Sequence, residues 1–187
     1  YTEYVFDRQW PDAEQALYYA NLYDVAVDDG GNVYLCDASW DYRITKITPS
    51  GDVVFDIASD YPSALAVAAD GSLYVGNIGD WGIYRFSATG EHLGTIARSP
   101  APSSSAADLA FGPDGTIYVS DIHSHTVARY AQDGTQLARW GGFGTEQSQF
   151  RSPYCVAVDH DGFVYVGDFH NRRVKKFTAD GTFVAEW

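Results

Sequence analysis

Short apolar runs separated by glycine-containing dipeptides follow one another along the chain. Some runs are apolar throughout, as in 25–27 and 156–158, which is typical of a strand covered on both faces. Others mix polar and apolar positions, as in 135–140, which is typical of a half-exposed edge strand. Asp-Gly and similar dipeptides favour tight hairpins, because glycine readily adopts the positive φ that these turns require. No segment has a convincing helical period, so the pattern predicts an all-β protein with antiparallel strands.

A repeat sets the register of these strands. Its marker is a tyrosine in the second run of each unit, and successive copies lie 40, 44 and 47 residues apart: Tyr34, Tyr74, Tyr118 and Tyr165. Periods of this length are typical of stacked or circular arrays, and each unit has the pattern strand, turn, strand, loop, strand, turn, strand. The sequence therefore predicts one β-propeller region over 1–187. Its four-stranded antiparallel blades are expected at 22–58, 62–97, 106–140 and 153–187, after an outer strand of a preceding blade at 1–10.

The last unit also resembles a known family. Residues 153–168, followed by 171–177 and 180–187, are similar to one NHL repeat, and the segment from Trp140 to Pro153 is similar to the connector between such repeats. The second unit departs from the pattern, because Asn77 replaces the usual aspartate and the loop after it lacks the Asn-His-Arg signature. The resemblance implies a β-propeller of NHL repeats with about six blades.

A six-bladed ring needs more residues than the four units supply, on the order of 260. We expect the chain to be an excerpt of a longer protein, since it starts at Tyr1 and contains no methionine. The alternatives are a true four-bladed ring and a homo-oligomer that closes a larger ring between chains. All three follow from the same requirement, which is that the apolar faces of the blades be covered.

The charge of the chain limits the classes of partner that it can bind. The formal net charge is -13, which repels nucleic acid and anionic membrane surfaces, and the basic patch of Arg172, Arg173, Lys175 and Lys176 is small. No stretch is apolar and long enough for membrane insertion. Cys36 and Cys155 are too few for a disulfide framework and are expected to be small packed thiols. Strong acidity, few lysines and a processed start favour an extracellular or periplasmic protein, with salt adaptation as the alternative.

The loops between the second and third strands of the blades are the candidate binding surface. By register they lie on one face around the axis and are rich in aromatic, histidine and arginine side chains, which anchor partners well. The candidate residues are Trp40, Tyr42, Arg43, Trp81, His123, His125, His170, Asn171 and Arg172. The alternative interpretation is structural, because exposed aromatic side chains on loops can simply cover neighbouring blades.

The sequence favours no metal or other cofactor. His123 and His170 occupy equivalent positions, and equivalent positions in neighbouring blades lie a blade width apart, which is too far to share zinc. Acidic segments such as 28–32 and 159–162 share a register with poorer ligand sets, so they are interpreted as hairpin turns rather than calcium loops. The acids or amides that end the second strands are expected to cap loop amides: Asp37, Asn77, Asp121 and Asp168.

The sequence gives little indication of a catalytic site. Relatives of this fold include a zinc-dependent lyase whose histidines stand where strands enter the ring, and none of the corresponding residues here is histidine: Tyr23, Asp24, Ser63, Ala64, Ala107, Asp108, Tyr154 and Cys155. The favoured function is a non-catalytic binding or structural scaffold that recognises a protein, peptide or glycan. The competing hypothesis is a metal-dependent lyase or hydrolase with an axial site.

Overall fold

The computed structural model describes residues 21–38, 42–78, 82–98 and 106–187. In these residues the fold is all-β, as predicted: sixteen strands are present, with one short 3-10 helix, η1 (Phe169–Asn171). No helix in the described part of the chain is long and apolar enough to cross a membrane. The outer strand expected at 1–10 lies outside the described residues.

The strands form four antiparallel sheets in sequence order, and neighbouring strands in each sheet follow one another in the chain. Sheet 1 contains β1 (Leu22–Val27), β2 (Val33–Asp37), β3 (Arg43–Ile47) and β4 (Val53–Ala58). Sheet 2 contains β5 (Pro62–Val67), β6 (Leu73–Asn77), β7 (Gly82–Phe86) and β8 (His92–Arg98). Sheet 3 contains β9 (Ala106–Phe111), β10 (Ile117–Asp121), β11 (Thr126–Tyr130) and β12 (Gln136–Gly141). Sheet 4 contains β13 (Pro153–Val158), β14 (Val164–Asp168), β15 (Arg173–Phe177) and β16 (Phe183–Glu186).

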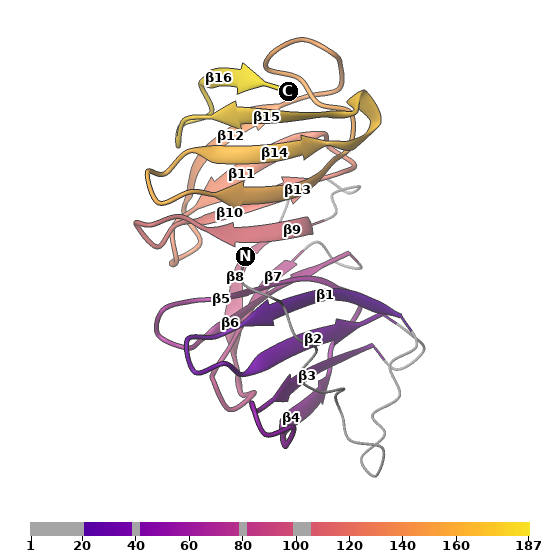
Figure 1. Ribbon diagram of the computed structural model, residues 1–187, viewed down its shortest axis with the longest axis vertical. Helices are drawn as coiled ribbons and strands as arrows, with labels where there is room; N and C mark the ends of the chain where they lie inside the picture. The colour runs from indigo at the N-terminus through magenta and orange to yellow at the C-terminus, as the bar shows by residue number, and fades with distance from the viewer. Residues whose placement is uncertain (1–20, 39–41, 79–81, 99–105) are drawn as a thin grey trace, which may run out of the picture.

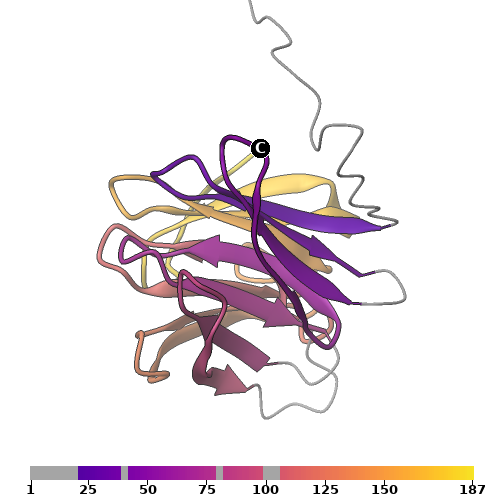
Figure 2. The ribbon, with the colours of Figure 1, turned by 90° about the horizontal axis from the view of Figure 1, so that it is seen from below.

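The first strands of the sheets lie near the middle of the molecule, and β4 and β16 lie at its opposite ends (Figure 1). Strand β5 packs between β1 and β9, and β9 packs in turn against β13. Figure 2 gives a second view of the sheets around these central strands. The arrangement explains the sequence pattern, since β5 is almost wholly buried whereas the fourth strand β12 is mostly exposed.

Three apolar clusters fill the joints between successive sheets. Tyr34 and Leu73 belong to the cluster between sheets 1 and 2, Tyr74 and Ile117 to the next, and Tyr118 to the third. These three register tyrosines are therefore core residues, and each is almost completely buried. Each of them fills one sheet-to-sheet joint, whereas the fourth, Tyr165 of the last sheet, is half-buried.

Each register tyrosine also sits in a repeated polar contact that the sequence did not predict. In sheet 3, the Arg129 guanidinium lies 5.6 Å from the Tyr118 ring centroid and pairs with Asp114 in the first turn. The same set recurs with a cation from the third strand in every sheet: Asp28, Tyr34 and Lys46; Asp70, Tyr74 and Arg85; Asp159, Tyr165 and Lys176. The acidic turns, interpreted as hairpin turns from the sequence, are thus also the partners of these cations.

Replacing Arg129 with methionine should lower the free energy of unfolding by about 1–2 kcal/mol, because the ion pair with Asp114 and the cation–π contact with Tyr118 are both lost. Methionine retains most of the apolar stem that packs over the ring. Urea unfolding measures the change. Arg139→Met, on the exposed side of β12, is the matched control. Equal loss in the two variants would contradict a stabilising role of this contact.

The two end sheets expose faces that the middle sheets bury. The prediction that the run 25–27 is covered on both faces is therefore wrong, because Val25 and Val27 of β1 are 58% and 59% exposed. The run 156–158 is only partly covered, since Val156 is buried and Ala157 is exposed. At the other end, Trp187 pairs with Val174 as Trp140 pairs with Val127, yet Trp187 is exposed while Trp140 contacts Phe177 of the next sheet. The expectation that both cysteines are packed is wrong for Cys155, which is an exposed free thiol because β13 has no sheet beyond it in the described chain; Cys36 is buried.

Candidate binding site at the mouth of the central axis

A hollow of about 250 Å³ opens where the first strands begin. Every sheet contributes to its lining, which consists of Asn21, Leu22, Tyr23, Ser63, Ile78, Ala107, Ile122 and Tyr154. Most of these residues stand at the start of β1, β5, β9 or β13, and the two isoleucines directly follow β6 and β10. The mouth therefore lies on the face that carries the loops between the second and third strands.

Two tyrosines determine the chemical properties of this hollow. Tyr23 and Tyr154 are 48% and 50% exposed, and the Tyr154 ring lies 5.6 Å from that of Phe169. Leu22 and the two isoleucines add apolar surface. Tyrosine combines a large apolar ring with a hydroxyl, and such side chains anchor partners at low entropic cost. The mouth can therefore bind a ligand that offers both an apolar surface and hydrogen-bonding groups.

Below the mouth, polar side chains join the first strands to one another. The Ser63 hydroxyl donates to the carbonyl of Ala106 at 2.6 Å. The Asp24 carboxylate accepts from the Leu65 amide at 2.7 Å, and the Asp108 carboxylate accepts from the Val156 amide at 2.8 Å. These side chains hold neighbouring sheets in register at the level just under the hollow.

Burial changes the acidity of both carboxyls. It raises the pKa of Asp24 against the lowering effect of its amide hydrogen bonds. Burial also raises the pKa of Asp108 to about 6, and the negative charge of Asp24 adds to the effect against the hydrogen bond from Val156. Removing two like charges from water in one region disfavours their ionised forms.

The predicted loop residues of sheet 1 that the structure describes contact nearby segments of the chain and do not line the mouth. Tyr42 has φ 41° and its ring centroid lies 4.1 Å from that of Tyr61 in the connector to sheet 2. Arg43 forms an ion pair with Asp56 on β4. Tyr42 thus contacts the segment that leads to the next sheet, whereas Arg43 pairs within its own sheet. Trp40 and Trp81 lie outside the described residues.

The predicted histidines gather near the joint of sheets 3 and 4. Nδ1 of His125 accepts a hydrogen bond from the Ser152 amide at 3.0 Å, and its ring lies 5.1 Å from Phe143. Burial lowers the pKa of His125; nearby Asp121 opposes this effect, and His123 and then, more weakly, His170 add to it. A neutral ring keeps Nδ1 available as an acceptor. The described residues contain no group of three or more histidines, cysteines or acids that could hold a metal ion.

Of the remaining predicted residues, Asn171 binds the connector between sheets 3 and 4, residues 142–152. Asn171 donates to the Gly144 carbonyl at 2.9 Å and to Asp168 at 2.8 Å. Arg172 has φ 56° and lines a second hollow with Tyr154 and Trp187 on the exposed face of sheet 4. This hollow shares Tyr154 with the axial mouth and is otherwise lined by different residues.

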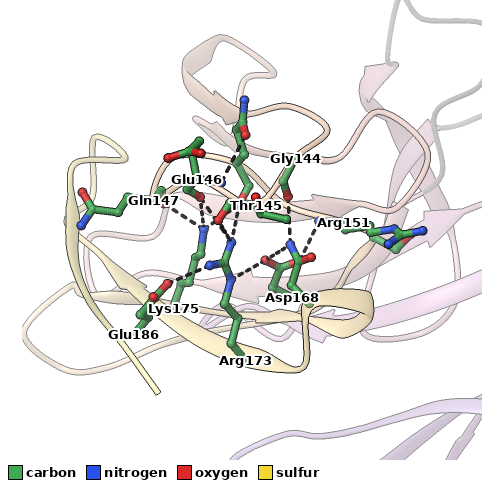
Figure 3. Close-up of polar contacts among 12 residues, drawn as sticks. Gly144, Thr145, Glu146, Gln147, Arg151, Asp168, Arg173, Lys175 and Glu186 are labelled. Atoms are coloured by element: carbon green, nitrogen blue, oxygen red, sulfur yellow. Dashed lines mark hydrogen bonds and ion pairs between the residues drawn. The ribbon is translucent and has the colours of Figure 1, made fainter.

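Figure 3 shows the polar cluster that fastens this connector. The fully buried Asp168 accepts from the Arg151 amide at 2.6 Å and from Nε of Arg173 at 2.9 Å. Nζ of Lys175 is also buried and donates to the carbonyls of Glu146, Gln147 and Gln149 at 2.6–3.0 Å. Two members of the basic patch seen in the sequence are therefore structural, and their positive charges face the interior of a joint.

The aspartates that end the second strands of sheets 1, 3 and 4 cap loop or connector amides. Asp37 accepts from the Asn21 amide, Asp121 from the amides of His123 and Ser124, and Asp168 from that of Arg151. The prediction is confirmed for these aspartates. Asn77 donates to the Asp60 carbonyl, because its amide nitrogen is a donor where aspartate has only acceptors.

The axial residues were not predicted as a binding site. Tyr23, Ser63, Ala107 and Tyr154 were considered only as positions where a related lyase has histidines. A signal was nevertheless available, because each of them stands at the entry of a first strand in the repeat register. Large tyrosines at two such entries point to a surface that converges on the axis.

Comparisons with known proteins agree with this architecture. The NHL repeat model matches residues 150–177. No curated protein matches the sequence. The structure is similar to a streptogramin B lyase, with TM-score 0.75, 16% identity and coverage of 90% of this chain and 55% of that one. It is also similar to a catalytically inactive virginiamycin B lyase from Staphylococcus aureus with quinupristin, with TM-score 0.74, 18% identity and coverage of 89% and 55%.

A further similar structure is that of a nidogen/laminin complex, with TM-score 0.67, 16% identity and coverage of 83% of this chain and 59% of that one. The chain thus spans 54–60% of the length of these solved structures. Sequence identities this low establish only that the fold is similar. The four sheets, their order and the matched repeat together identify a chain of β-propeller fold that carries an NHL repeat at residues 150–177.

Proposed function

We propose that this chain is a non-catalytic binding module that recognises a protein, peptide or glycan at the mouth of the propeller axis. The observation that carries the proposal is the hollow to which all four sheets contribute, with Tyr23 and Tyr154 half-exposed at its rim. Convergence of several sheets on one concave spot is the geometry in which propellers and other closed folds hold ligands.

The size of the hollow limits what enters it. At about 250 Å³ it is smaller than the usual range of roughly 300–1,000 Å³ for sites that enclose a drug-sized ligand. It suits one side chain of a protein or peptide, or one sugar ring, with the rest of the partner lying across the loop face. Tyrosine rings provide the stacking and hydroxyl contacts that either occupant requires.

The uncovered faces of sheets 1 and 4 support a second element of the proposal, in which further blades or a second copy complete the ring. Trp187 occupies the position at which Trp140 packs against the next sheet, so another sheet would bury Trp187 in the same way. The similarity to a nidogen/laminin complex supports a protein partner and an extracellular or periplasmic location. The six-bladed ring stays part of this proposal.

Simultaneous Tyr23→Ala and Tyr154→Ala substitution should reduce partner binding at least about tenfold, because truncating a central aromatic anchor typically costs more than about 1 kcal/mol. The wild-type chain and the double variant can be compared on arrays of peptides and glycans, with the best ligand titrated afterwards. Both tyrosines are half-exposed, so the variant should keep the wild-type unfolding temperature.

Leu137→Ala is the matched control, because Leu137 is similarly exposed but lies on the outer strand β12. Binding that falls equally in the control and the double variant would count against the axial mouth. Metal-dependent conversion of a bound peptide or glycan would instead favour the alternative function, a lyase or hydrolase with an axial site. The similarity to two lyases is the observation that keeps this alternative open.

A further inference from the structure

Another hollow, of about 660 Å³, lies between sheets 1 and 2 and away from the axial mouth. Its lining is rich in aromatic side chains and consists of Ala58, Ser59, Asp60, Tyr61, Asn77, Tyr84, Phe86 and His92. The His92 ring lies 5.7 Å from Tyr84 and 5.2 Å from Phe86. We call this hollow between sheets 1 and 2 the flank groove. Its volume is within the range of sites that enclose a ligand.

The same place in the joint of sheets 3 and 4 is filled by the chain itself. The register aligns the two joints, because Phe86 pairs with His92 in sheet 2 as Phe177 pairs with Phe183 in sheet 4. In the joint of sheets 3 and 4, the fully buried Phe150 of the connector packs against Phe177 with ring centroids 5.5 Å apart. A phenyl ring therefore occupies the space that the flank groove leaves empty.

Connector length causes the difference. The connector between sheets 1 and 2 is 59–61, whereas that between sheets 3 and 4 is 142–152. Both end on a residue with positive φ just before the proline that opens the next sheet, Tyr61 at 49° and Ser152 at 59°. The short connector thus lacks the segment that contains Phe150. The side chains of the two joints also differ in size, since Ile57 takes the register position of the larger Trp140.

We propose that the flank groove binds a peptide segment that carries an aromatic side chain, with the aromatic ring seated on Phe86 as Phe150 is seated on Phe177. Polar side chains also lie at the groove. Tyr84 takes the register position of Lys175, which holds the connector carbonyls in the other joint. Arg98 lies opposite Gly82 and donates to the Tyr84 hydroxyl at 3.2 Å, which places a guanidinium beside the groove.

Charge favours a peptide with a basic residue next to the aromatic one. Asp60 is exposed at the rim, and no lysine or arginine of the described residues pairs with its carboxylate. The whole chain has a net charge of -13, which attracts cationic ligands. The chain's own segment 148–152 has this composition, with Phe150 followed by Arg151.

The test is a titration of the chain with the blocked peptide acetyl-Ser-Gln-Phe-Arg-Ser-amide, followed by NMR at the aromatic resonances of Tyr84, Phe86 and His92. We expect saturable shifts at these residues. Replacing phenylalanine by alanine in the peptide should weaken binding at least about tenfold, because the buried ring supplies most of the apolar contact. No saturable binding, or equal binding of the alanine peptide, would overturn the proposal.

Two protein variants locate the site. Ser59→Trp should block the groove and weaken binding at least about tenfold, and His92→Ala should weaken it about threefold or more by removing one aromatic wall. His160→Ala, on an exposed turn of sheet 4, is the matched control and should bind like the wild type. Binding that survives both Ser59→Trp and His92→Ala would place the peptide elsewhere and refute the assignment. Tyr23→Ala should leave this binding intact, which separates the groove from the axial mouth.

Discussion

The Asp168→Ala variant should lose about 3–5 kcal/mol of unfolding free energy and release the connector 142–152 from sheet 4. Asp168 is fully buried and accepts hydrogen bonds from the Arg151 amide, Asn171 and Arg173. Its removal leaves the largely buried Arg173 guanidinium without this carboxylate, and breaking a buried ion pair from one side typically has this cost. Glu186, which also pairs with Arg173, places the expected loss toward the lower end.

Urea unfolding measures the loss, and hydrogen exchange of the amides in 142–152 locates it. Asp161→Ala is the matched control, because Asp161 lies on an exposed turn of the same sheet. We expect faster exchange in the connector for Asp168→Ala alone. Unchanged exchange there, together with a stability equal to that of the control, would show that the carboxylate does not hold the connector.

The Asp108→Asn variant should change the pH dependence of stability between about pH 4 and pH 6. Burial, helped by the charge of Asp24, raises the pKa of Asp108 from 3.8 to about 6 in the folded chain. The folded state therefore holds a proton that the unfolded state has already released in this window. Stability from this group is fully present below the unfolded pKa and is lost as the pH rises through the folded pKa.

The free energy of unfolding of the wild type, minus that of Asp108→Asn, should fall by less than about 3 kcal/mol as the pH rises from 4 to 7. Asp114→Asn is the control of opposite sign. Burial opposes the effect, but hydrogen bonds from Thr116 and the charge of Arg129 lower the pKa of Asp114. Its stabilising effect is present above the unfolded pKa and is lost as the pH falls. Parallel curves for the wild type and Asp108→Asn from urea unfolding at each pH would contradict the prediction.

The strands, their turns and the register of the repeat could be predicted because these features depend on residues close in sequence. Gly115 illustrates the point: it adopts φ 76° in a turn where its amide bonds to the Gly112 carbonyl and the Asp114 carboxylate accepts from Thr116. The apolar run 25–27 indicated burial on both faces, but β1 exposes Val25 and Val27. The equivalent run of β5 is almost wholly buried because β1 and β9 pack on either side of it. Hairpins of this kind form from local turn chemistry and strand pairing.

The sequence placed candidate binding residues on the face of the loops between the second and third strands, and that assignment stays a prediction. Tyr42 and His125 were chosen for their residue type and loop position, but one stacks with Tyr61 and the other accepts from the Ser152 amide in a connector. The axial hollow needs Tyr23 of sheet 1 and Tyr154 of sheet 4 at the same time. Residues so far apart in sequence converge only after all the sheets have packed, and no local pattern reports that convergence.

The sequence by itself determined the all-β fold, the positions of the hairpins and the resemblance of the last unit to an NHL repeat. The tertiary structure decided which charges face solvent and which joints are full. Lys175 belongs to a basic patch in the sequence. In the structure the connector covers it, and its Nζ donates to three connector carbonyls. The lengths of segments 59–61 and 142–152 are written in the chain, but whether a joint is open depends on the volume between packed sheets. That volume follows from the side chains of both neighbours and from the path of the connector, so only the packed structure reveals it.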